Sequence, residues 1–141
     1  MISQTSEYAL RAVIHLATYT DEPQTTQKIA AQTKVSVPYL SKVLQGLARA
    51  GIVHSQRGLH GGFELKNTLD ELTVYDIVNA IEPIQRIEKC PLGLDNHKDH
   101  LCLLHMRVDE AIGALEKVFK ETTIADVIAT PSSSVPLDAQ K

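Results

Sequence analysis

The sequence predicts a mainly helical fold with a small β-hairpin wing, arranged as a winged helix-turn-helix that is followed by a long C-terminal dimerisation helix. Apolar residues recur at helical spacing over most of the chain, and a glycine-rich turn separates two short strand-like runs. A last long segment carries a row of apolar residues at coiled-coil spacing. The 141 residues, of which 43% are hydrophobic and 22% charged, suit one globular domain with an appendage.

The first two helices each have a start signal and a stop signal. The first is expected over residues 5–19, where apolar residues fall on one face. Pro23 interrupts this pattern and marks a turn. A short second helix then begins at a threonine cap, Thr25 or Thr26, and ends near Thr33.

The third helix has a strong amphipathic pattern. Ser36 is a suitable N-cap, and Pro38 lies in the first turn, where its missing N–H costs nothing. Gly51 ends the helix. The apolar face repeats at i, i+3, i+4, i+7 and i+8, and it consists of Leu40, Val43, Leu44, Leu47 and Ala48.

A β-hairpin is expected after the third helix. Ile52 and Val53 begin one strand, GLHGG at residues 58–62 forms the turn, and residues 63–65 form the returning strand. Two short helices joined by a tight turn and followed by a hairpin are typical of a winged helix-turn-helix. Another short helix is expected over TVYDIVNAIE, which Pro83 closes.

The long C-terminal helix is predicted from about residue 103 to residue 121. A helix with a coiled-coil-like seam on a small domain needs a partner surface, and a homodimer supplies one. Packing against the same chain is the alternative. Residues 130–141 are polar and contain proline, so we expect them to be disordered. The predicted seam, at 4-3-4 spacing, consists of Val108, Ile112, Leu115 and Phe119.

Charge is segregated along the chain, although the formal net charge is only −3. Residues 28–66 contain six basic residues and one acidic residue, which gives +5, and the rest of the chain carries −8. The basic segment coincides with the predicted winged helix-turn-helix, so we predict that this unit binds a double-stranded DNA operator. A solvated charged face, or a winged helix that binds protein, is the alternative.

The expected DNA contacts follow from how such units dock. The second helix enters the major groove, and the wing reaches the backbone or the minor groove. Backbone N–H groups at the start of the preceding helix attract phosphates. The candidate DNA-binding residues are therefore Thr26, Gln27 and Lys28 in that helix, Ser36, Pro38, Tyr39, Ser41 and Lys42 in the recognition helix, and Arg57, Gly58, His60, Gly61 and Gly62 in the wing.

Potential metal ligands gather in the segment RIEKCPLGLDNHKDHLCLLH. Cysteine and imidazole bind zinc and iron–sulfur clusters, but the spacing fits no standard zinc finger. An exposed polar loop with incidental histidines, or a reversible disulfide between the two cysteines, is the alternative. The potential ligands are Cys90, His97, His100, Cys102 and His105.

The sequence argues against an enzyme and against a membrane protein. No general base accompanies an open metal position, and GLHGG lies in a hairpin rather than before a helix. No apolar run approaches the ~20 residues that span a bilayer, and the N-terminus lacks the features of a signal peptide. We therefore expect a cytoplasmic protein, in which two cysteines suit metal or redox chemistry better than a structural disulfide.

Five blocks in order carry a family resemblance: SEYALRAVIHLA, VSVPYLSKVLQGLARAGIVHSQRGLHGGFEL, TVYDIVNAIE, the cysteine loop ending in CLLH, and TTIADVI. Up to about residue 129, the chain resembles the Rrf2 family of winged-helix bacterial regulators, which includes IscR- and NsrR-like proteins. The resemblance implies a homodimeric transcription regulator, expected to be a repressor, that senses redox, nitrosative or iron–sulfur status. Its parts would be a DNA-binding domain at 1–83, a ligand loop at 84–106, and a dimerisation helix with a short return segment at 107–129.

The same resemblance implies an iron–sulfur cluster held by three cysteines and a fourth ligand. Asn96 stands where the family has its middle cysteine, and asparagine is a poor cluster ligand. A two-iron, two-sulfur cluster would then need histidines, or a glutamate of the first helix contributed across the dimer. Zinc, no metal, a thiol switch and a partner signal remain open. The candidate ligands are Cys90, Cys102, His105, His97 and Glu7.

Overall fold

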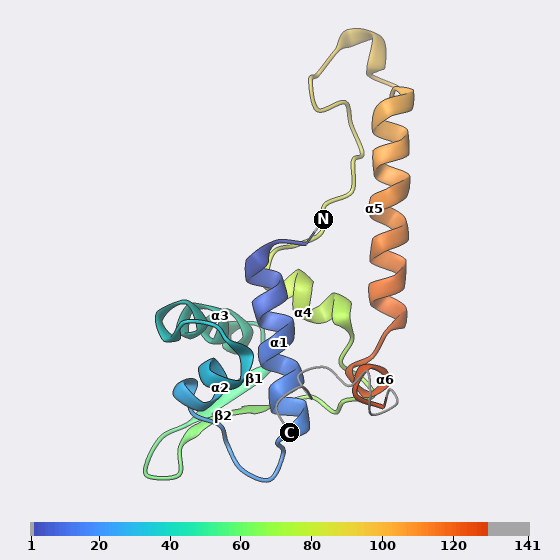
Figure 1. Cartoon of the computed structure of the whole chain (residues 1–141). Helices are drawn as coiled ribbons and strands as arrows, with labels where there is room; N and C mark the ends of the chain where they lie inside the picture. Colours follow the sequence, from blue (N-terminus) through green and yellow to red (C-terminus); the bar gives the residue numbers. More distant parts are fainter. Residues whose placement is uncertain (1, 130–141) are drawn as a thin grey trace.

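A computed structural model describes residues 2–129 and confirms the predicted fold class (Figure 1). A body of helices and one hairpin is joined to a long helix and an extended loop. The expected disorder of residues 130–141 lies outside the described residues. The elements in order are α1 (Gln4–Thr18), α2 (Thr26–Thr33), α3 (Val37–Arg49), β1 (Val53–Gln56), β2 (Gly62–Leu65), α4 (Val74–Ile81), the 3-10 helix η1 (Asp95–His97), α5 (Leu103–Glu121) and α6 (Ile124–Ile128).

Local sequence signals set the ends of the helix-turn-helix. Thr25, not Thr26, caps α2, and its side-chain oxygen accepts the backbone N–H of Lys28 at 3.2 Å. Lys34 follows α2 in the left-handed conformation, with φ of 58°, and makes the tight turn. Ser36 occupies the N-cap of α3, and Pro38 lies in its first turn, as the sequence predicted.

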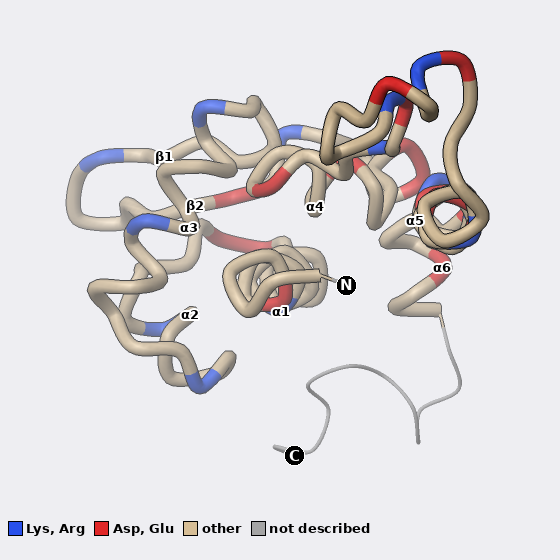
Figure 2. The backbone as a smooth tube through the Cα atoms, turned by 90° about the horizontal axis from the view of Figure 1, so that it is seen from above, with Lys and Arg blue, Asp and Glu red and all other residues tan. Residues whose placement is uncertain are grey.

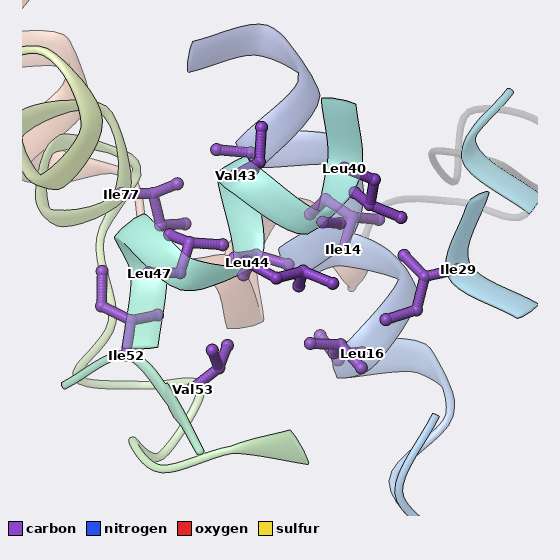
Figure 3. Close-up of a cluster of buried hydrophobic side chains, with 14 of the residues drawn as sticks. Ile14, Leu16, Ile29, Leu40, Val43, Leu44, Leu47, Ile52, Val53 and Ile77 are labelled. Atoms are coloured by element: carbon purple, nitrogen blue, oxygen red, sulfur yellow. The ribbon is translucent and has the colours of Figure 1, made fainter. Parts of the chain in front are cut away.

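The core is built around α3. Four of the five residues of its predicted apolar face are buried and Ala48 is half-buried, and Figure 3 shows side chains from α1, α2, the start of β1 and α4 converging on this face. Each large aliphatic side chain that is fully buried stabilises the folded state by roughly 1.5–3 kcal/mol. The core therefore fixes the position of α3 relative to every other element of the body. Its labelled members are Ile14, Leu16, Ile29, Leu40, Val43, Leu44, Leu47, Ile52, Val53 and Ile77.

The hairpin is bonded to the segment that precedes α2. Strands β1 and β2 pair in antiparallel fashion, with Val53 opposite Leu65 and Gln56 opposite Gly62. At the base of the wing, Gln24 and Phe63 exchange two backbone hydrogen bonds of 2.9 and 2.7 Å. The wing and the helix-turn-helix are thus one hydrogen-bonded unit.

We expect Gly62→Ala to destabilise this unit. Gly62 has a φ of +154°, and a Cβ there would lie 2.6 Å from the backbone C and O of Gln24. The obstacle is backbone, so the bridge must open, at a cost of more than about 1 kcal/mol. Urea unfolding of the variant measures this loss. Leu59→Ala, at a side chain that is 96% exposed, is the control, and an unchanged Gly62→Ala midpoint would contradict the close approach.

The C-terminal end of α5 is joined to the body through a helix that the sequence predicted only as a short return segment. Helix α6 begins with a capping box between Thr123 and Asp126. Thr123 pairs with Thr73 as an isolated antiparallel bridge, and the N–H of buried Ile124 donates to the carbonyl of Leu72 at 2.8 Å. The connection α5–α6 is therefore fixed at the entrance to α4.

Candidate DNA interface and cysteine loop

The candidate DNA-binding residues lie on α2, α3 and the wing. Figure 2 shows Lys and Arg positions on α2, on α3 and at the β1–β2 turn, along the same side of the body. Most of the candidates are open to solvent, and four of them are half-buried. The exposed ones are Gln27, Lys28, Ser36, Pro38, Tyr39, Lys42, Arg57, Gly58 and His60, and the half-buried ones are Thr26, Ser41, Gly61 and Gly62.

Tyr39 has a structural role that the sequence pattern does not reveal. Its hydroxyl lies 2.6 Å from the Thr5 hydroxyl of α1, and its ring meets the Tyr8 ring edge-on at a centroid distance of 5.3 Å. Such edge-to-face pairs stabilise by roughly 0.5–1.5 kcal/mol beyond the area they bury. Tyr39 therefore holds the first turns of α3 against α1, in addition to any contact that it makes with DNA.

Glu7 lies in the body of the molecule. Its carboxylate accepts a 2.8 Å hydrogen bond from Nε of Arg11, whose Nη1 donates to the backbone carbonyl of Thr33 at 3.0 Å. This pair lies at a shallow pocket of about 240 Å³, together with apolar side chains of α1, α4 and α6. Through Arg11, this pair connects α1 to the end of α2. Within one chain, Glu7 thus belongs to the winged-helix unit and not to the cysteine loop.

The cysteine loop contains two separate cysteine–histidine pairs. Cys90 Sγ lies 3.7 Å from His97 Nδ1, and Cys102 Sγ lies 3.3 Å from His105 Nδ1. Across residues 2–129, no three His, Cys, Asp or Glu side chains are grouped so as to hold one metal ion. The described donor atoms of one chain therefore do not gather into the four-ligand set of an iron–sulfur cluster, and the sequence position midway between the two cysteines is Asn96, whose amide is a poor ligand.

The base of the loop is clamped to α5. Nε and Nη2 of Arg86 each donate to the Asp109 carboxylate at 2.7 Å, and the backbone N–H of Ile87 donates to it at 2.9 Å. The Arg86 guanidinium, followed by the Ile87 N–H, lowers the pKa of Asp109 to about 2. Gly113 leaves room for this contact, because a Cβ there would lie 3.0 Å from the guanidinium.

The surroundings of Cys90 favour the thiolate form of its side chain. Hydrogen bonds from the backbone N–H of Leu94, then from His97, and then from the backbone of Leu92 and Gly93 lower the pKa of Cys90 to about 7. In metal-free Cys102→Ser protein, we expect iodoacetamide to modify Cys90 with a half-maximal rate near pH 7. The thiolate is the nucleophile, so the rate rises as pH passes through the pKa.

Mass spectrometry of the alkylated protein over a pH series measures this midpoint. His97→Ala removes one of the hydrogen bonds and is expected to raise the midpoint. A midpoint near 8.5 in the parent variant, the ordinary value for a free cysteine, would contradict the described hydrogen bonds.

The apolar row predicted as the α5 seam lies on one stripe of the helix, and its members differ in exposure. Ile112 and Leu115 are half-buried and line a pocket with α1, α4 and the loop base, and Phe119 is half-buried too. Only Val108 of that row is exposed. One flank of the row therefore packs toward α4 and the base of the loop, and its role as a dimer seam stays a prediction. At 100° per residue, the exposed apolar row consists of Leu104, Val108, Ala111 and Val118.

The body and its exposed basic side define the class of protein: a winged helix-turn-helix that binds DNA. Residues 2–130 match the family model Rrf2, described as an iron-dependent transcriptional regulator. The chain belongs to the Rrf2 family. It is thus a DNA-binding transcriptional regulator and not an enzyme, as the sequence predicted.

Several relatives are similar over most of their length. A putative HTH-type transcriptional regulator of Aquifex aeolicus is 33% identical, over 91% of both chains. The HTH-type transcriptional regulator NsrR of Geobacillus kaustophilus is 29% identical, over 91% of this chain and 89% of its own. The structure of CymR, described as the global cysteine regulator of B. subtilis, is 27% identical with a TM-score of 0.78, and the match covers 93% of this chain and 98% of CymR. The structure of IscR of T. potens gives a TM-score of 0.76 at 25% identity, and the match covers 92% of this chain and 86% of IscR.

In residues 2–129, no helix combines the length and apolar character that a membrane span requires.

Proposed function

We propose that the chain is a homodimeric, sequence-specific repressor that binds a partly palindromic operator in the cytoplasm, with the cysteine loop as its signal input. The observation that carries the proposal is the exposed basic side of α2, α3 and the wing in a chain of a transcription-regulator family. Lys28, Lys42 and Arg57 supply phosphate contacts, and the start of α3 reads base edges in the major groove.

The exposed apolar row of α5 supports the homodimer. Leu104, Val108 and Val118 are 67%, 40% and 58% exposed, which is unusual for aliphatic side chains aligned on one stripe of a helix. Two such stripes packed together would bury them, as in a coiled coil. The resulting two-fold symmetry would present two recognition helices to two half-sites of the operator.

The two attachments of α5 support the coupling of the loop to the DNA-binding unit. The N-terminal half of α5 is clamped to Arg86, and its C-terminal end is fixed at Thr73 through the bridge to Thr123. A chemical change at the cysteines would therefore act on a helix that also sets the geometry of the dimer. Signals of the matching chemistry are a thiophilic metal ion, an oxidant that joins Cys90 and Cys102, or a nitrosating agent.

The proposal is tested by selecting DNA fragments that bind the purified chain and footprinting the enriched sequence. We expect two protected half-sites of a palindrome about one helical turn apart, on the same face of the DNA duplex. Gel shifts with metal-free, metal-loaded and oxidised protein then compare operator affinity among the three forms. Enrichment of no sequence over random DNA in any form would overturn the proposal.

A further inference from the structure

We propose that the tip of the wing enters the minor groove of the operator, where Leu59 makes the chain prefer A·T base pairs and His60 donates to base acceptors. The inference rests on the proposed function and deepens it, because it assigns a base preference to a part of the operator that α3 does not read.

The first argument is the shape of the tip. The backbone N–H of Gly61 donates to the carbonyl of Gly58 at 3.0 Å, which closes a four-residue β-turn. Leu59 and His60 occupy its two central positions. Gly58 has a φ of +111°, and a Cβ at Gly61 would collide with the backbone carbonyl of Gln56. Both ends of the turn therefore favour glycine, so the tip carries two side chains and has bare backbone on either side of them.

The second argument is the exposure of an aliphatic side chain at this tip. Leu59 is 96% exposed, the highest value among the large apolar side chains of residues 2–129. It takes no part in the hydrophobic core of the described residues, so the fold does not require an apolar side chain at this position. Proteins that bind the minor groove use apolar side chains, leucine among them, as contacts to the bases.

The third argument is the placement of the tip beside the recognition helix. Gln24, just before α2, exchanges two backbone hydrogen bonds with Phe63 of β2, so the hairpin is held on the helix-turn-helix. Figure 2 shows the β1–β2 turn on the side of the body that carries the Lys and Arg positions of α2 and α3. When α3 occupies the major groove, the tip is therefore held toward the neighbouring minor groove.

The charge of the wing suits this contact. Residues 53–63 contain Arg57 and no acidic residue. The next residue, Glu64, is engaged across the hairpin: its Oε1 lies 2.6 Å from Nε2 of His54 and accepts a 3.1 Å hydrogen bond from Nε2 of Gln56. The tip itself therefore presents no carboxylate to the phosphates that line the groove.

The chemistry of the minor groove sets the preference. Every base pair presents acceptors there, and a G·C pair adds the N2 amino group of guanine, which is a donor. The imidazole of His60 carries an N–H in either protonation state, so it can donate to the acceptors of both kinds of pair. Leu59 offers no acceptor to the guanine amino group, which would lose its water when the leucine covers it. Leu59 therefore disfavours G·C pairs.

The test uses the full-length chain and the operator enriched by selection. Each position next to the half-sites is synthesised with A·T, G·C or inosine·C, and fluorescence anisotropy gives the affinities. At the positions that the wing touches, G·C is expected to bind about tenfold more weakly than A·T. Inosine·C has the major-groove groups of G·C but lacks the N2 amino group, so it is expected to bind like A·T. Inosine·C that binds as weakly as G·C would overturn the proposal.

Variants of the tip assign the preference to a side chain. Leu59→Ala is expected to bring the ratio of A·T to G·C affinities close to one, and Leu59→Met, which keeps an apolar side chain of similar volume, is expected to retain the ratio. His60→Ala is expected to weaken binding to all three operators and to keep the ratio.

Leu92→Ala is the matched control, because Leu92 is a 74% exposed leucine outside the winged unit, and it is expected to leave the ratio unchanged. A ratio that persists in Leu59→Ala and disappears in Arg57→Ala would overturn the role of Leu59 and assign the preference to the guanidinium.

The same fragments separate this inference from the proposed function. If the chain protects an operator but binds A·T, G·C and inosine·C equally at every position next to the half-sites, only the base preference of the wing is overturned. If selection enriches no sequence, the proposed function is overturned and the base preference falls with it.

Discussion

Replacing Val108 and Val118 together by aspartate is expected to convert the dimer into monomers and to reduce operator affinity by about a hundredfold or more. Both side chains lie in the exposed apolar row of α5. A carboxylate buried in the dimer interface without a partner costs several kcal/mol, and each protomer would contribute two of them. The variant is expected to stay folded, because neither side chain is buried within its own chain.

The variant is expected to lose DNA affinity because a monomer cannot bind both half-sites of the operator at once. In a dimer, binding of one recognition helix places the second one beside its half-site at a high effective concentration. Monomers lose this gain and retain the weak binding of one winged unit.

Sedimentation velocity gives the oligomeric state, and gel shifts give the operator affinity. Lys117→Asp is the control, because nine residues at 100° each place Lys117 on the opposite side of α5 from Val108. A double variant that remains dimeric at micromolar concentration would show that the interface lies elsewhere.

The double variant Lys42→Ala/Arg57→Ala is expected to weaken operator binding by about a hundredfold at moderate ionic strength. Lys42 lies on the exposed face of α3 and Arg57 precedes the turn of the wing. Each phosphate contact releases about one condensed counterion, so the variant is also expected to lose about two from the slope of log affinity against log salt.

Fluorescence anisotropy over a salt series measures both quantities in one experiment. Lys120→Ala removes one positive charge from α5, where Lys120 pairs with Glu116 at 2.6 Å, and it is expected to leave the slope unchanged. Equal slopes for the double variant and the parent would exclude these two residues from the phosphate contacts.

The helix-turn-helix could be predicted closely because its signals are local. The spacing of Leu40, Val43, Leu44 and Leu47 defines a buried face wherever the helix packs, and Pro38 marks its first turn. The α5 bounds were predicted for the same reason. None of these signals depends on residues far away in the chain.

The faces of α5 and the clamp at the loop base could not be predicted, because they depend on distant partners. Asp109 carries no local pattern that marks it as the acceptor for Arg86, 23 residues earlier. That contact lies beside the flank of the apolar row that turns inward. Likewise, the sequence gathers the histidines and cysteines of the loop but does not reveal that they form two pairs.

The bridge between Thr73 and Thr123 has a consequence for the order in which the chain folds. The two residues of this bridge are about 50 positions apart in the sequence. Closing the bridge therefore costs more chain entropy than forming the local helix-turn-helix. On the ribosome, the winged unit is complete long before Ile124 emerges to fill its buried position against α1 and α4. We therefore expect the amides of Val74 and Ile124 to exchange with solvent together, as one late-forming cooperative unit whose opening leaves the helix-turn-helix intact.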